Sequence, residues 1–249
     1  MTTQQAARVA LVTGGSRGIG AATARALADA GLDVVISYAA SADKAQEVVR
    51  DLQSRGVRAA AYRADQSDSR QVAELVDTVA ATFGRLDVLV NNAGVAVNGA
   101  VDDPEPDTAA FDRQVVVNLG GVVTAIRAAT RVLGRGGRII TVGSTLAARA
   151  GFPNLADYAA TKAAVTGYSR GAARDLAARE ITVNVVQVGP VATDMNPPQG
   201  GWADQQRATV ALGRFGTPEE IAAGIVFLAS PGASFITGSV LTIDGGVLA

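Results

Sequence analysis

The sequence predicts an α/β protein with a Rossmann-type fold, a doubly wound parallel sheet of about seven strands with helices on both faces. Short runs of β-branched and apolar residues alternate with longer helical segments along the chain. Strands buried on both faces that alternate with helices form a parallel sheet with right-handed crossovers. A glycine-rich turn at residues 13–20 joins the first strand to the first helix. No linker, repeat or low-complexity block divides the chain, so we expect a single domain over residues 1–249.

Each predicted strand is a short apolar run, and each predicted helix is a longer segment with an apolar stripe. The predicted strands are residues 8–13, 33–37, 57–63, 86–91, 138–142, 181–187 and 239–243. The predicted helices are residues 18–30, 41–55, 68–83, 108–133 and 155–178.

Two later segments need separate interpretation. Residues 221–243 carry no charge and are long enough to span a bilayer. Pro231-Gly232 interrupts this segment, so we expect a buried helix, a turn and a buried strand instead. Residues 189–201 contain three prolines and several glycines, which is typical of a mobile loop over a pocket. We therefore expect a substrate loop at about 189–212.

The composition excludes several classes of function. Hydrophobic residues make up 48% of the chain and charged residues 18%, which indicates a compact globular protein. A net charge of −1 argues against partners such as nucleic acid polymers or anionic membranes. The chain has no cysteine and no histidine, so we expect no disulfide, no thiol nucleophile and no metal site. Residues 1–15 lack the long apolar stretch of a signal peptide, so we expect a soluble, cytoplasmic protein.

The glycine-rich turn has the placement of a phosphate-binding loop. Gly14 permits the tight turn, Gly18 lets the backbone approach a pyrophosphate, and Gly20 lets the helix pack on the strand. The N-terminus of the following helix offers free N–H groups and the positive end of its dipole. Glycine-rich turns without a ligand are common, but this position in a doubly wound sheet favours a dinucleotide site.

The end of the second strand indicates which nicotinamide cofactor fits. In such folds a carboxylate at that end holds the ribose 2′-hydroxyl of NAD. Asp33 is at a suitable count from the glycine turn, but it begins the strand and lies about five residues, at ~3.3 Å each, from the ligand end. That end, residues 37–39, has no acid. The polar residues placed to receive a 2′-phosphate are Ser16, Arg17, Ser37 and Ser41. We therefore expect NADPH to be preferred over NADH, with Arg17 as a solvated surface charge being the alternative.

Tyr158 and Lys162 offer proton chemistry in a chain without histidine or cysteine. The two residues are four positions apart, so they share one helix face. A phenol titrates near pH ~10, and a nearby ammonium or oxidised nicotinamide lowers that pKa. Ser144 follows the fifth strand at the carboxyl edge of the sheet, where its hydroxyl can hold a carbonyl oxygen while Tyr158 delivers the proton. The alternative is an ordinary exposed tyrosine and lysine with a loop hydroxyl.

Taken together, the motifs resemble the short-chain dehydrogenase/reductase superfamily in its single-domain branch of roughly 250 residues. The resemblance covers nearly the whole chain. Its marks are TGGSRGIG at 13–20, NNAG at 91–94, Asn118, Ser144, Tyr158 with Lys162, and GPVATDM at 189–195. It implies an NAD(P)-binding domain and an oxidoreductase that acts on C=O and CH–OH groups.

The resemblance also implies roles for individual residues. Lys162 would bind the nicotinamide ribose as well, and Asn118 would hold a water that links Lys162 to solvent. Asp65 would contact adenine, although it could equally be the acid at the N-terminus of the next helix. The predicted catalytic set is Asn118, Ser144, Tyr158 and Lys162. The predicted cofactor contacts are Gly14, Ser16, Arg17, Gly18, Ile19, Gly20, Ser37, Tyr38, Ser41, Asp65, Gln66, Asn92, Ala93, Gly94, Tyr158, Lys162, Gly189 and Thr193.

One position departs from the family pattern. Many relatives read Pro-Gly after the sixth strand, whereas this chain reads Val188-Gly189 with Pro190 one step later. Valine keeps the backbone N–H that proline lacks, so the loop path and pocket wall are expected to differ. From the family we also expect a homotetramer that uses the alanine-rich helices, with Ala159, Ala163 and Ala164, and the last strand.

The leading functional prediction is an NADPH-dependent carbonyl reductase, reversible to a secondary-alcohol dehydrogenase, with a small-molecule substrate. Its look-alikes include 3-oxoacyl-(acyl-carrier-protein) reductases, for which a basic docking patch would be needed. Candidates for that patch are Arg131, Arg135 and Arg174, although exposed arginines are usually only solvated. The residues expected to line an apolar pocket, or to pack as core or lid, are Leu146, Phe152, Met195 and Trp202.

The alternative comes from another class. The stretch 184–201 also resembles short-chain relatives linked to cyclic-di-GMP binding and biofilm dispersal. Such a regulator could keep the fold and the catalytic residues, and fold alone does not decide between the two.

Overall fold

The computed structural model describes residues 7–249. Residues 1–6, which belong to the predicted domain and to the segment in which we expect no signal peptide, lie outside the described residues. One seven-stranded sheet runs through the molecule in the order β3-β2-β1-β4-β5-β6-β7, and each neighbouring pair is parallel. This order confirms the predicted doubly wound fold. The strands are β1 Val9–Val12, β2 Asp33–Tyr38, β3 Ala59–Arg63, β4 Leu86–Asn91, β5 Leu133–Ser144, β6 Thr182–Val188 and β7 Val240–Ile243.

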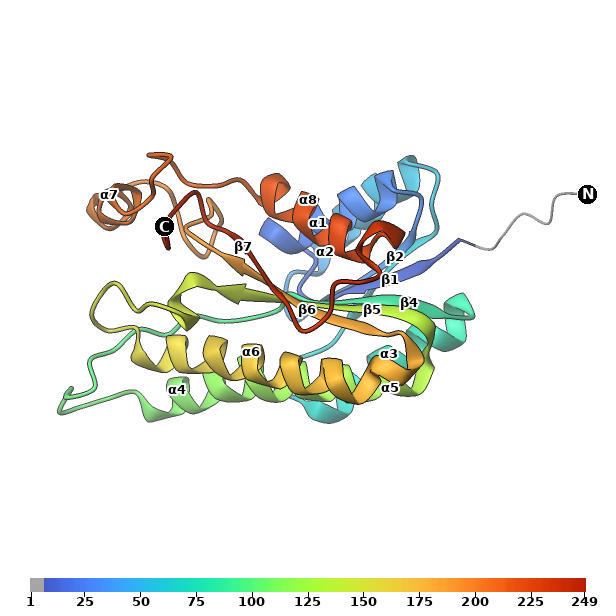
Figure 1. Ribbon diagram of the computed structural model, residues 1–249, viewed down its shortest axis with the longest axis horizontal. Helices are drawn as coiled ribbons and strands as arrows, with labels where there is room; N and C mark the ends of the chain where they lie inside the picture. The colour runs from blue at the N-terminus through green and yellow to red at the C-terminus, as the bar shows by residue number, and fades with distance from the viewer. Residues whose placement is uncertain (1–6) are drawn as a thin grey trace, which may run out of the picture.

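Helices cover both faces of the sheet (Figure 1). The helices are α1 Gly18–Asp29, α2 Ala42–Ser54, α3 Ser69–Phe83, α4 Thr108–Val115, α5 Gly121–Val132, α6 Ala156–Leu176, α7 Gly201–Ala208 and α8 Pro218–Ala229. α1, α2 and α8 lie on one face, and α3 to α6 lie on the other. Short α7 stands apart, near the C-terminus at the left of Figure 1. Two apolar clusters fill the layers, one on each face of the sheet.

The sheet register brings the site together. Val12 of β1 is paired with Ile36 of β2 and with Val90 of β4, so the carboxyl ends of the three strands lie within two residues of one another at one edge of the sheet. Ser144 at the end of β5 is paired with Val188 at the end of β6. The strand order reverses between β1 and β4, and a crevice opens at such a reversal at the carboxyl edge of the sheet. That edge lies at the left in Figure 1.

Local sequence explains where several helices begin. Asp68 caps α3 by accepting hydrogen bonds from the backbone N–H groups of Arg70 and Gln71. α8 begins with a capping box, in which Thr217 and Glu220 each bind the other's backbone N–H, and with Pro218 in its first turn. The first turns of both helices are therefore fixed by side chains adjacent in the sequence.

The structure corrects four sequence predictions. The helix predicted over 108–133 is interrupted by a π-helical turn at Val116–Gly120, which carries Asn118. β5 begins at Leu133 rather than at residue 138, because Leu133 pairs with Leu86 before an irregularity shifts the register. The predicted substrate loop at about 189–212 contains α7. The last strand, β7, is half-exposed at the edge of the sheet rather than buried.

Two segments have the length and apolar character of a membrane span. Residues 221–243 divide into α8, a short 3-10 turn and β7, as predicted apart from the burial of β7. The helical run Thr108–Val132 is also long and apolar enough to cross a membrane, by length and composition only, and 44% of its most apolar stretch is buried inside the protein. α5 packs against α3, α6 and the sheet, so this run has the environment of a core helix.

Candidate active site

A cavity of about 520 Å³ opens at the carboxyl edge of the sheet. Every predicted catalytic or cofactor residue lines it except Gly20 and Asn118, which lie behind its wall. All four residues of the predicted apolar pocket also line it. The cavity has a cofactor half, formed by the glycine loop and the ends of β1, β2 and β4. Its substrate half is formed by the segments after β5 and β6 and by α7.

The glycine loop is packed so closely at Gly14 and Gly20 that neither position has room for a Cβ. A Cβ on Gly14 would lie 2.9 Å from the Cα of Ala93, and Gly14 has a positive φ of 65°. A Cβ on Gly20 would lie 2.4 Å from the carbonyl oxygen of Gly14. Gly20 therefore lets α1 approach the loop itself, which refines the prediction that it packs on the strand. Such a turn before a helix N-terminus fits the pyrophosphate of a dinucleotide.

Hydrogen bonds hold this half of the cavity in place. The Asn92 amide donates to the carbonyl oxygens of Thr13, at 2.8 Å, and Gly14, at 3.1 Å. The Thr13 hydroxyl accepts from the N–H groups of Asn92 and Ala93. Ser37 is buried, and its hydroxyl accepts from the N–H of Gly14 at 3.3 Å. Ser37 therefore supports the glycine loop, in addition to lining the predicted phosphate region.

Arg17 does not stand alone as a surface charge. Its guanidinium and the ammonium of Lys44 each lie 3.5 Å from Asp194, whose carboxylate bridges them. Lys44 belongs to the first turn of α2, close to Ser41, and was not predicted. Asp194 follows Thr193 in the predicted substrate loop. Two cations therefore gather beside the end of β2, while Asp33 at the start of that strand is buried and accepts from the N–H of Arg58.

Asp65 and Gln66 line the far part of the cofactor half. The Asp65 carboxylate accepts from the N–H and hydroxyl of Ser67 and pairs with Arg113 at 3.4 Å. These partners hold the pKa of Asp65 below its usual range, chiefly through the hydrogen bond from the Ser67 backbone. The N-cap of the next helix, α3, is Asp68 and not Asp65, so the alternative role considered for Asp65 is taken by Asp68. The Gln66 Nε2 is buried beside Gly121 and has no hydrogen-bond partner among residues 7–249.

Ser144, Tyr158 and Lys162 meet where the two halves join. The Ser144 hydroxyl oxygen accepts from the N–H of Leu146 at 3.2 Å, which leaves its own proton to donate. The Lys162 Nζ donates to the carbonyl oxygen of Val142 at 3.0 Å and lies 5.6 Å from the centre of the Tyr158 ring. Lys162 is only 7% exposed. The three side chains thus converge from β5 and α6 on one end of the cavity.

Burial controls the acidity of this pair. It raises the pKa of Tyr158 to about 12 and lowers the pKa of Lys162 to about 8. The expectation that Lys162 lowers the pKa of Tyr158 is therefore wrong for this chain as it stands. Loss of water around the phenol is the cause of the rise. The consequence is that Tyr158 keeps its proton at neutral pH.

Asn118 lies in the π-helical turn and supports the site from behind. Its Oδ1 accepts from the N–H of Val95 at 2.9 Å, and its Nδ2 donates to the carbonyl oxygen of Val95 and to the hydroxyl of Thr161. Thr161 in turn donates to the carbonyl oxygen of Tyr158 at 2.8 Å. Asn118 thus ties the segment after β4 to the turn of α6 that carries Tyr158. The π-helical turn explains how asparagine is accommodated within a helix.

The wall of the substrate half comes from three segments. The rings of Phe152 and Trp202 meet edge to face, with their centres 4.8 Å apart. Asn196 and Gln206 exchange two amide hydrogen bonds of 2.9 Å, which fix the predicted loop to α7. Val188, the family departure, ends β6 and lines the cavity. Further lining residues that the sequence prediction did not include are Asn98, Arg113, Arg149, Asp194, Asn196, Gln206, Thr209 and Val247.

Two arginines of the suggested docking patch have partners in the chain. Arg131 pairs with Asp77 and Arg135 with Glu180. Arg174 is exposed in the last turn of α6. The structure thus gives this patch little free positive charge. Among residues 7–249, no group of three or more acidic side chains has the arrangement of a metal site.

Comparison with known proteins shows the family of this chain. Residues 14–248 match the family described as enoyl-(acyl carrier protein) reductase. A 3-oxoacyl-(acyl-carrier-protein) reductase FabG of Staphylococcus aureus is 40% identical over 241 residues, covering 96% of this chain and 97% of the relative. A cyclic-di-GMP-binding biofilm dispersal mediator protein of Escherichia coli is 40% identical over 238 residues, covering 96% of each.

A solved structure is similar over almost its whole length. It is a short chain dehydrogenase from Burkholderia cenocepacia in complex with NADP. It is 48% identical, has a TM-score of 0.94, and covers 98% of this chain while this chain covers 99% of it.

Proposed function

Since this chain belongs to the short-chain dehydrogenase/reductase superfamily and is an NAD(P)H-dependent oxidoreductase of C=O and CH–OH groups, we propose that it is an NADPH-dependent carbonyl reductase. It would reduce a small-molecule ketone and, in reverse, oxidise a secondary alcohol. The observation that carries the proposal is the convergence of Ser144, Tyr158 and Lys162 on the cavity that the glycine loop also lines.

The cavity supports the binding of a dinucleotide. Gly14 and Gly20 of the glycine loop leave no room for a Cβ, the loop precedes a helix N-terminus, and the NADP-bound relative has the same fold. Residues that would hold the cofactor are the glycine-loop residues 14–20, Asp65 with Gln66, residues 92–94, Thr193 and Lys162. The lack of an acid at the end of β2 and the cations Arg17 and Lys44 beside it favour a 2′-phosphate, hence NADPH over NADH.

The chain's own residues then supply the proton chemistry. A bound NADPH supplies the hydride for the carbonyl carbon. Ser144 donates a hydrogen bond to the carbonyl oxygen, because its hydroxyl accepts from the N–H of Leu146 and its own proton remains free. Tyr158 donates the proton to that oxygen as the alcohol forms. Lys162 favours the resulting phenolate, and Asn118 holds the turn of α6 through Thr161.

The test is NADPH oxidation followed at 340 nm on a panel of ethyl 3-oxoesters and aryl ketones, repeated with NADH. We expect turnover that is faster with NADPH and that Tyr158→Phe abolishes. The absence of turnover with every ketone in the panel would contradict the proposal.

The similarity to the biofilm dispersal mediator protein of Escherichia coli supports a second candidate function, a nucleotide-binding regulator on the same fold. That protein is described as binding cyclic-di-GMP. A calorimetric titration with cyclic-di-GMP distinguishes the two functions. Micromolar binding together with no carbonyl turnover would favour the regulator, whereas turnover without such binding would favour the reductase.

We also propose a cytoplasmic homotetramer with no metal, no membrane and no nucleic acid polymer as partner. The half-exposed edge strand β7 and exposed Phe235 support assembly, as does the exposed, alanine-containing outer face of α6. Analytical ultracentrifugation tests it, and a monomer at micromolar concentration would contradict it.

A further inference from the structure

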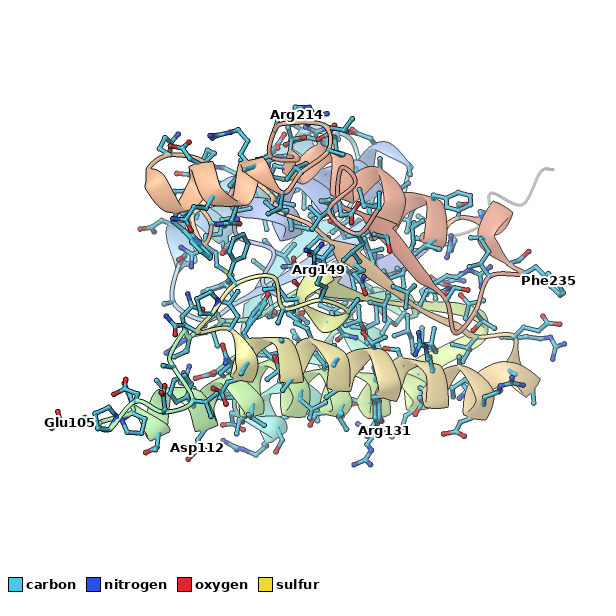
Figure 2. The ribbon with its side chains drawn as sticks, turned by 60° about the vertical axis from the view of Figure 1, so that its left-hand side comes forward. Glu105, Asp112, Arg131, Arg149, Arg214 and Phe235 are labelled. Atoms are coloured by element: carbon cyan, nitrogen blue, oxygen red, sulfur yellow. The ribbon has the colours of Figure 1, made fainter. Side chains whose placement is uncertain are left out.

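Arg149 is a cation in the substrate half that the proposed chemistry does not use. Its backbone N–H donates to the carbonyl oxygen of Thr145 at 2.9 Å, in the helical turn that directly follows Ser144. The residue is exposed and lines the cavity. Figure 2 shows Arg149 at the middle of the open edge, between α6 and the layer that carries α7. The backbone of Arg149 is thus held about one helical turn from Ser144, and its long side chain starts from that point of the wall.

The other charges of the cavity are already compensated. Among the lining residues, Arg17 pairs with Asp194 and Arg113 pairs with Asp65. The buried Lys162 donates to a backbone carbonyl. Within residues 7–249, no carboxylate lies in ion-pair reach of Arg149, and its guanidinium makes no hydrogen bond to another residue of the chain. Two acids line the cavity within residues 7–249: Asp65 lies in the cofactor half, and Asp194, on the segment after β6, is paired with Arg17 and Lys44.

The substrate half that Arg149 lines also has an apolar wall. Phe152 and Trp202 form an edge-to-face pair, and Leu146 and Met195 line the same half. A substrate that fills this half therefore presents a flat or aliphatic body to the wall. A cationic substrate would meet Arg149 with no acid to compensate it, whereas an anion would gain a charge-assisted hydrogen bond.

We infer that Arg149 selects ketones that carry an anionic group, a carboxylate or a phosphate, at the far end of an apolar or aromatic body. The inference rests on the proposed reductase function and names its substrate class. The acid group is separated from the ketone by several bonds, because Arg149 is one turn removed from Ser144 along the wall. A planar guanidinium binds either oxyanion through two parallel hydrogen bonds.

Matched substrates test this selection. 4-Acetylbenzoate, 4-acetylphenyl phosphate and the uncharged 4-acetylbenzamide share one ketone and one ring, and kcat/KM is measured for each with NADPH. We expect the wild type to prefer an anionic ketone over the amide by about 10- to 100-fold. The two anions show whether carboxylate or phosphate is the better ligand.

Variants assign the preference to one side chain. Arg149→Gln should bring the ratio of anion to amide close to one, Arg149→Glu should invert it, and Arg149→Lys should retain part of it. Arg127→Gln is the matched control, because Arg127 is exposed on α5, does not line the cavity and changes the net charge equally. A ratio that Arg149→Gln leaves unchanged, or a ratio that Arg127→Gln lowers as much, would overturn the inference.

A binding measurement separates this inference from the reductase function. Trp202 is the single tryptophan of the chain and lines the cavity, so its fluorescence reports directly on this half. Benzene-1,4-dicarboxylate and its diamide are titrated in the presence of NADP⁺. Tighter binding of the dicarboxylate to the wild type than to Arg149→Gln, without turnover of any ketone, would overturn the reductase function and keep the anion site. Equal binding to both proteins would overturn the anion site.

Discussion

The two halves of the cavity are built in different ways. The cofactor half is made by backbone in contact with backbone, as at Gly20, whose Cβ would lie 2.4 Å from the carbonyl oxygen of Gly14. The substrate half is made by side chains from three distant segments, and Met195 and Trp202 there are exposed. At Gly201, the first residue of α7, an added Cβ would meet nothing within 4 Å.

This difference has a physical meaning. A phosphate loop must present N–H groups at fixed positions, and that requires a rigid turn between strand and helix. A substrate wall needs only shape and a few polar groups, which loops on a rigid scaffold can supply and vary. We therefore expect small changes in the cofactor half to be costly, and changes in the substrate half to alter selectivity at little cost in stability.

The largest effect should arise at Tyr158, where the two halves meet. Tyr158→Phe removes the proton donor, so kcat for ketone reduction should fall by about 10²- to 10⁴-fold. Cofactor binding should persist, because the glycine loop is untouched. Stopped-flow kinetics and the fluorescence of bound NADPH measure the two quantities. Wild-type kcat in this variant would remove Tyr158 from the proposed mechanism.

A pair of glycine substitutions compares the halves directly. Gly20→Ala forces backbone apart in the glycine loop, and we expect NADPH affinity to fall by at least about 100-fold, because rigid backbone cannot move away from the new methyl. Gly201→Ala adds the same methyl in open space within a helix, so it should keep affinity and raise stability by about 0.5–1 kcal/mol. Isothermal titration and urea unfolding measure both. Equal losses in the two variants would contradict the comparison.

The buried Lys162 should lower the free energy of unfolding, although it takes part in the proposed chemistry. Burial lowers its pKa from 10.5 in the unfolded chain to about 8. The charged lysine is thus penalised in the folded state below pH 8, and the penalty disappears as the pH rises from 8 towards 10.5. Lys162→Met should therefore raise the free energy of unfolding by about 1–3 kcal/mol at pH 7.

The pH dependence is the control for this prediction. The gain in the free energy of unfolding from Lys162→Met should shrink at pH ~9.5, where the lysine of the folded protein is already neutral. This pH lies below the range in which Tyr158 of the folded protein titrates. Urea unfolding at both pH values measures it. A variant that is less stable than the wild type by the same amount at both would mean that the hydrogen bond to Val142 outweighs the burial of the charge.

The same difference explains what the sequence alone could predict. The glycine loop, and the pair Tyr158 and Lys162, each depend on residues close together in the chain, so both could be recognised in the sequence and indicated the fold and the cavity. β4 has the predicted bounds, because its apolar run is continuous. α7 was missed, since its eight residues begin among glycines and are held by contacts such as Asn196 with Gln206. The π-helical turn at Asn118 depends on Val95 and Thr161, which no local pattern identifies.

Arg17 should show how far the cofactor half tolerates a loss of charge. Arg17→Ala removes one of the two cations beside the end of β2, so the Kd for NADPH should rise by about 10-fold while that for NADH changes little. Lys44 limits the loss because it remains in place. Titrations of both cofactors at one salt concentration measure the effect. An equal loss for NADH would mean that Arg17 holds the loop rather than the 2′-phosphate.

The smallest effect should come from Asp194, which links the halves. Its carboxylate lies 3.5 Å from both Arg17 and Lys44, and a 2′-phosphate would compete with it for these cations. Asp194→Asn should therefore lower the Kd for NADPH by about 2- to 5-fold, the range of an exposed ion pair, and leave NADH unchanged. The gain should vanish in ~1 M salt, where the Debye length is about 3 Å. Asp204→Asn is the control, because Asp204 pairs with Arg207 within α7. Weaker binding of both cofactors to Asp194→Asn would show instead that this carboxylate fastens the substrate loop over the cofactor half, so that the two halves close as one unit.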